Sequence, residues 1–86
     1  MRFRGDLYEG GQLRLSGIGG DIQRRARGAG GPIDVSGSFE VAKGPGHVPL
    51  PGNIYELRLD DGTATAIIIE AINDKGNNHA IRFREN

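Results

Sequence analysis

The feature that most constrains this chain is a strict alternation of apolar and polar residues from Ile33 to Val41. The apolar members share one face, with Gly37 at the centre, and Asp, Ser and Glu residues occupy the other face. A period of two over this length is typical of a half-buried β-strand. A glycine on the inner face lets such a strand bend or lets a second backbone approach it closely.

The last third of the chain predicts an antiparallel meander of three strands. Residues 55–59 alternate in the same way, and Asp60-Asp61-Gly62-Thr63 carries the Asp-Gly pair that favours a tight hairpin. The return strand, 65–72, has apolar residues on both faces, which predicts that it is covered on both sides. After a polar loop, His79–Arg84 alternates again and forms the last strand.

The first third predicts two shorter strands. Phe3 and Leu7 share a face of the first, Leu13 and Leu15 define the second, and a bulge is expected near Gly17. Ile18 and Ile22 can extend this strand beyond the bulge. The segment 21–31 shows no helical stripe, only 23–27 has the composition of a helical turn, and the arginines and glycines of 24–31 are expected to lie in a loop. If the first and last strands pair, their arginines crowd onto one outer surface. These are Arg2, Arg4, Arg82 and Arg84.

Composition supports one small all-β domain. The chain has 86 residues, enough for a single domain over 1–86, and fifteen of them are glycine. With this much alternation, the glycines indicate turns and bulges and not disorder. About six short strands separated by glycine-rich turns predict a small antiparallel barrel or curled sheet, and a barrel would leave no exposed edge strand.

Enzyme and metal chemistry are not expected. The chain has no cysteine, and its two histidines, His47 and His79, have no second ligand at a metal-site spacing. No spacing nominates a Ser-His-Asp triad. We therefore predict a protein that is not an enzyme and has no metal and no cofactor.

Charge and hydropathy limit the partners. The formal net charge is zero, with eleven basic and eleven acidic residues, so no general attraction to nucleic acid or to an anionic membrane is expected. No window approaches the roughly 18 apolar residues of a membrane helix, and the residues after Met1 do not form a secretory signal. We expect a cytoplasmic protein with no membrane partner.

Two loops are candidate binding sites. Arg24, Arg25 and Arg27 precede a run of glycines, an arrangement suited to wrapping an anion or a nucleic-acid backbone; the alternative is a solvated loop. A second loop, 43–52, is rich in proline and carries His47, Val48 and Leu50. It either folds back to plug one barrel end or binds a partner.

Two resemblances accompany these patterns. The stretch Gly52–Gly62, with its Tyr-x-Leu-x-Leu-Asp-Asp-Gly sequence, resembles a phrase in small uncharacterised bacterial β-barrel proteins, which implies a hairpin and no known activity. The order of arginine cluster, Asp-x-Ser strand and final strand resembles PilZ domains, which bind a cyclic dinucleotide. Gly28 and Phe39 stand where that family's motifs have arginine and glycine. The resemblance implies nucleotide-binding roles for Arg24, Arg25, Arg27, Asp34 and Ser36.

The sequence therefore favours a non-enzymatic interaction module that binds another protein or copies of itself. The alternative is an anion, nucleotide or nucleic-acid binder that uses the arginine loop.

Overall fold

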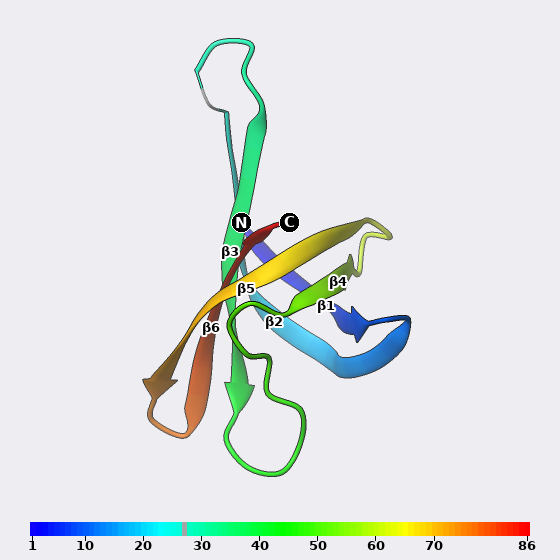
Figure 1. The fold of residues 1–86 in the computed structure, drawn as a ribbon, viewed down its shortest axis with the longest axis vertical. Coiled ribbons are helices and arrows are strands. Elements are labelled where there is room, and N and C mark those ends of the chain that lie inside the picture. The colour runs from blue at the N-terminus through cyan, green and yellow to red at the C-terminus, as the bar shows by residue number, and fades with distance from the viewer. Residues whose placement is uncertain (27) are drawn as a thin grey trace.

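The computed structural model describes residues 1–26 and 28–86, and this part of the chain contains strands and turns but no helix. All pairings are antiparallel, and the strands close into a barrel in the order β1-β2-β3-β6-β5-β4 (Figure 1). The predicted all-β barrel and its C-terminal meander are confirmed. The strands are β1 (Arg2–Glu9), β2 (Gln12–Ala26), β3 (Ile33–Ala42), β4 (Ile54–Leu59), β5 (Ala64–Lys75) and β6 (Asn78–Glu85).

The barrel closes between β1 and β4, not between the first and last strands. β1 pairs with β4 from Gly5↔Leu59 to Tyr8↔Glu56, while β6 lies between β3 and β5. The predicted crowding of terminal arginines is therefore wrong, because β2 and β3 separate the arginines of β1 from those of β6. The reason is the path of the chain, since the segment 43–53 carries it from β3 to the far side of the barrel, beside β1.

The core is formed by inward-facing side chains from every strand. Phe83 packs against Phe39 and Phe3, with ring centroids 6.0 and 6.1 Å apart. The buried apolar side chains are Leu7, Ile18, Ile22, Phe39, Tyr55, Leu57, Leu59, Ile67, Ile69, Ile81 and Phe83.

A β-bulge explains why Ile72, three positions after Ile69, lies on the same face of β5. Ile69 pairs with Phe83 and Ala71 pairs with Arg82, so Glu70 is an extra residue on this strand. The extra residue shifts the alternation by one position, and Ile72 faces the core as Ile69 does. The prediction that β5 is covered on both sides is therefore wrong. The bulge expected near Gly17 is present. The backbone N–H of Gly17 donates to Asp6 Oδ1 at 2.9 Å.

The loop expected over 24–31 begins later than predicted. β2 continues to Ala26 and pairs with β3 from Gly20↔Phe39 to Ala26↔Ile33. The helical turn expected over 23–27 is wrong at residues 23–26, and residue 27 lies outside the described residues. This segment is a strand because it pairs with β3, and its own sequence does not predict that pairing.

Gly37 allows two strands and a core ring to meet. A Cβ at this position would lie 2.3 Å from the carbonyl oxygen of Asp21 on β2 and 2.6 Å from the Phe83 ring. Both distances are shorter than any relaxed contact. The close approach predicted for this inner-face glycine is therefore present.

We expect Gly37→Ala to lower the free energy of unfolding by about 1–3 kcal/mol, because the added methyl group overpacks this contact. Urea unfolding followed by circular dichroism measures the change. Gly19→Ala is the matched control, since its Cβ would meet only the Phe3 carbonyl oxygen at 3.7 Å, and it should change stability by no more than about 0.5 kcal/mol. Equal effects of the two substitutions would contradict the close approach.

Candidate functional site

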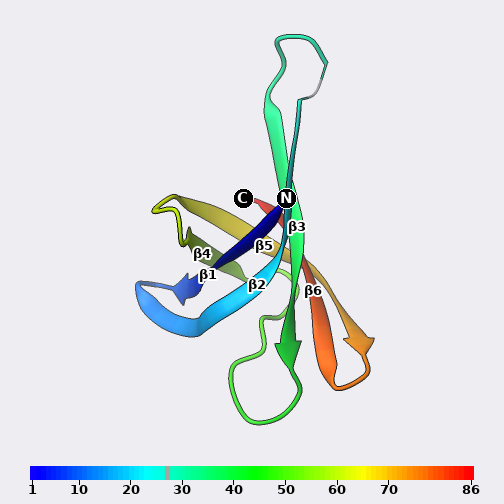
Figure 2. The ribbon, with the colours of Figure 1, turned by 180° about the vertical axis from the view of Figure 1, so that it is seen from behind.

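The β2–β3 hairpin projects beyond the barrel as an arm, which both views of the ribbon show (Figures 1 and 2). We define the arm as residues 23–26 and 32–35. β2 pairs with β1 only as far as Arg2↔Asp21, and β3 pairs with β6 only from Ser36↔Arg84. Beyond these points the described strands pair only with each other. Such a ribbon is marginally stable alone and exposes its edges.

The arm has one apolar face and one polar face. Ile33 and Val35 continue the inward-facing register of Phe39. Val35 still packs against the core, whereas Ile33, farther along the arm, is not covered by the barrel. Ile33 is 58% exposed, and Met1, at the base of the arm, is 72% exposed. Alternation that buries side chains in the barrel thus leaves an apolar surface on the arm.

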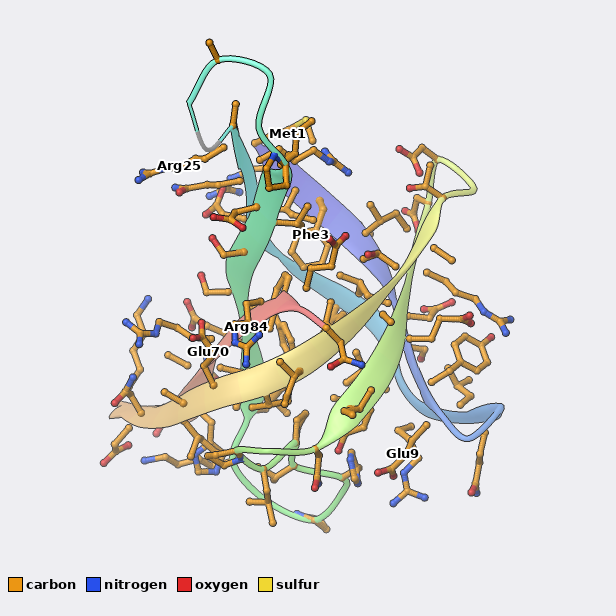
Figure 3. All side chains as sticks on the ribbon, turned by 45° about the horizontal axis from the view of Figure 1, so that its top comes forward. Met1, Phe3, Glu9, Arg25, Glu70 and Arg84 are labelled. Atoms are coloured by element: carbon orange, nitrogen blue, oxygen red, sulfur yellow. The ribbon has the colours of Figure 1, made fainter. Side chains whose placement is uncertain are left out.

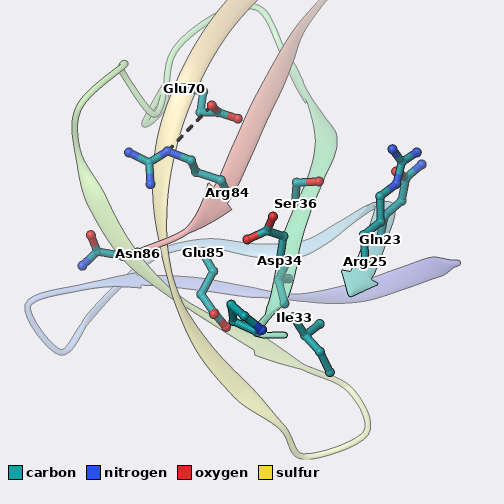
Figure 4. A pocket seen from close by; sticks show the side chains of 11 residues that line it. Gln23, Arg25, Ile33, Asp34, Ser36, Glu70, Arg84, Glu85 and Asn86 are labelled. Atoms are coloured by element: carbon teal, nitrogen blue, oxygen red, sulfur yellow. Dashed lines mark ion pairs between the residues drawn. The ribbon is translucent and has the colours of Figure 1, made fainter. Parts of the chain in front are cut away.

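The polar face of the arm borders a groove with a volume of about 640 Å³ (Figure 4). Arg25 and Asp34 occupy paired positions on β2 and β3, and Gln23 is paired with Ser36. The groove therefore brings together Arg25, Asp34 and Ser36 from the predicted ligand-binding set.

Other members of the predicted set lie elsewhere. Arg24 is paired with Val35 and follows the inward register of Ile22, so it belongs to the opposite face of the arm from Arg25. It lines a second hollow together with Met1 and Arg25. Arg27 lies outside the described residues. Arg25 thus borders both the groove and this second hollow, whereas Arg24 does not line the groove.

The groove also contains residues that the sequence did not suggest. Glu70 on β5 and Arg84 on β6 form an ion pair across it, with 3.7 Å between Arg84 Nε and Glu70 Oε2, and Glu85 lies beside them. Only the β3–β6 and β5–β6 registers bring these residues to the arm. The groove is therefore lined by charges of both signs, an environment that does not favour anions alone.

The proline-rich loop lies against the barrel at the end away from the arm. Its backbone bonds to β5, with Gly52 N–H donating to the Ile69 carbonyl at 2.8 Å and Ile69 N–H donating to the Asn53 carbonyl at 3.0 Å. Pro49 is buried, while Val48 is half-buried and Leu50 is 55% exposed. The loop thus packs as a plug, but Pro49 takes the place that was expected for Leu50.

His47 fastens this loop to the barrel. An Arg14 guanidinium N–H donates to His47 Nδ1 at 2.9 Å, and the His47 ring lies 2.6 Å from the Tyr55 hydroxyl through Nε2. Because a guanidinium can only donate, Nδ1 must accept, and the ring is neutral with its proton on Nε2. Burial lowers the pKa of His47 below its ordinary 6.5, and the positive charge of Arg14 acts in the same direction.

This geometry predicts a loss of stability in mild acid. In the unfolded chain His47 takes up a proton near pH 6.5, whereas in the folded chain it does so only at lower pH. The contribution of neutral His47 to the stability of the fold is complete above pH 6.5. It is lost as the pH falls toward the pKa of His47 in the folded chain. Urea unfolding at a series of pH values should show this decline in the parent and a flatter profile for His47→Gln. Identical profiles would contradict the role of His47.

Among residues 1–26 and 28–86, no group of three His, Cys, Asp or Glu side chains is placed to hold a metal ion. Asp74, near the end of β5, forms an ion pair with Lys43. This part of the chain also has no helix with the length and apolar character needed to span a membrane. No protein-family model, curated protein or solved structure matches the chain.

Proposed function

We propose that this chain is a non-enzymatic interaction module that binds another protein, or a second copy of itself, through the arm and the adjoining open end of the barrel. The observation that carries the proposal is the uncovered apolar face of the arm. Ile33 lies on a strand whose alternation is otherwise used for the core, yet it is 58% exposed. Contiguous apolar surface of this kind typically marks an interaction site.

The edges of the arm support the same proposal. An exposed two-stranded ribbon offers unpaired N–H and C=O groups to an added strand. Main-chain pairing at an edge and apolar contacts on one face are the two components of strand-addition interfaces. A binding partner would also stabilise a ribbon that is marginal by itself.

Site-specific photo-crosslinking tests this function. With a photoreactive amino acid at Ile33, irradiation of cells that express the chain should give a defined protein adduct, identified by mass spectrometry and suppressed by excess unlabelled chain. The matched control is Asn77, which is exposed in the β5–β6 turn and should give no such adduct. Equal labelling at both positions, or none at Ile33, would count against the arm as the binding element.

A second candidate is the binding of an anionic ligand in the outer groove. Arg25 and Arg84 reach this groove from different strands, and Ser36 and Gln23 add hydrogen-bonding groups. Planar guanidinium groups suit phosphate recognition. The carboxylates of Asp34, Glu70 and Glu85 in the same groove make this the weaker candidate.

If the groove binds an anion, a fluorescent nucleotide or single-stranded oligonucleotide should bind the parent at low salt and lose affinity as salt is added. The double substitution Arg25→Ala with Arg84→Ala should weaken this binding at least about tenfold, because each arginine contributes about 1 kcal/mol or more. Arg58→Ala is the control, since Arg58 lies over the Tyr8 ring, outside the groove. A parent that binds neither probe excludes this candidate.

A further inference from the structure

At the open end of the barrel, Arg24 on the arm and the aspartates of the β4–β5 turn lie on opposite sides of the ring. In the strand order β1-β2-β3-β6-β5-β4, the β2–β3 arm lies across the ring from the β4–β5 turn. The arm carries Arg24 and Arg25 on β2. The turn carries Asp60 and Asp61, and no Lys or Arg occurs between Asp60 and Ile69.

Asp61 is held in its ionised form. Its Oδ1 accepts hydrogen bonds from the Thr63 backbone N–H at 2.9 Å and from the Thr63 hydroxyl at 2.6 Å. These bonds lower the pKa of Asp61, and the positive charge of Arg24 adds to the effect.

Between the two charged sides lies an apolar centre. Phe3 is only partly buried and packs edge-on against the Phe83 ring, with an interplanar angle of 84°. Figure 3 shows its side chain within the mouth of the barrel, with Met1 at the base of the arm. Val35, which is half-buried against the core, joins this centre to the exposed Ile33 on the arm.

A surface of this kind is complementary to itself. When two copies face each other across a two-fold axis that lies in the interface and runs between Arg24 and Asp61, the Arg24 of each copy meets the Asp61 of the other. This is the arrangement of a two-fold interface, in which the same patch is used by both subunits. A different protein would need the same pattern of charge and apolar surface.

We propose that two copies of this chain associate through their open barrel ends, with the arm of each lying across the mouth of the other and Arg24 of each facing Asp61 of the other. This proposal rests on the proposed function and specifies that the binding partner is a second copy of the chain. The apolar centre supplies buried area, and the two symmetric charge contacts set the orientation.

Light scattering and sedimentation equilibrium test the association directly. The purified parent should reach the mass of a dimer at concentrations up to about 1 mM, the weak end of the usual affinity range. Its dissociation constant should rise with salt, because exposed charges are screened. A parent that stays monomeric at low salt over this whole range overturns the proposal.

Charge exchange tests the orientation. Arg24→Glu alone and Asp61→Lys alone each bring like charges together at both contacts, and each should weaken the dimer at least about tenfold. An equimolar mixture of the two variants should recover the affinity of the parent. The control is Arg82→Glu on the outer wall of the barrel, which makes the same charge change away from the mouth and should leave the dimer intact. Two folded single variants that dimerise like the parent overturn the arrangement.

Asp61→Lys also removes the acceptor for Thr63, so a second variant is needed. Asp61→Asn keeps an oxygen that can accept these bonds, and it should weaken the dimer without changing the circular dichroism spectrum. A monomeric parent whose Ile33 photo-crosslinks to a different protein would overturn self-association alone. A monomeric parent with no adduct at Ile33 would overturn the proposed function as well.

Discussion

The pairing of β1 with β4 is the constraint on which the rest of the molecule depends. It requires a very close backbone approach, since a Cβ at Gly5 would lie 2.3 Å from the Arg58 carbonyl oxygen. It also buries Leu7 and Leu57 completely. Because β1 is paired with β2 and β4, the third strand must pair with β6, and the chain must pass along one barrel end to reach β4. That passage covers one end with Pro49 and leaves the other end open below the arm.

Local patterns predicted the elements of the fold better than their arrangement. The alternation from Ile33 to Val41 and the Asp-Gly turn at 61–62 depend on nearest neighbours, so the sequence alone reveals them. The closure by β1 and β4 depends on contacts between segments about fifty residues apart, which no local pattern encodes. The Glu70 bulge was hidden because it changes the face of Ile72 without changing the composition of the strand.

For the candidate site too, the residue types were predictable from the sequence, but their arrangement in space was not. Arg25, Asp34 and Ser36 were identifiable by residue type, and the β2–β3 register brings them together. Arg24 was grouped with Arg25 because the two are adjacent in sequence, but in a strand adjacent side chains point to opposite faces. Arg84 and Glu70 had no local signal, because they reach the groove only through the pairings of β6.

The arm has a consequence for how the molecule moves through solution. The radius of gyration is 12.9 Å and the principal extents are 44 × 27 × 23 Å, whereas a compact chain of this length would have a radius of gyration of about 12 Å. An elongated particle experiences more friction than a sphere of equal mass. A single copy will therefore elute early in gel filtration and tumble anisotropically, so its NMR relaxation rates will depend on how each bond vector is oriented relative to the long axis.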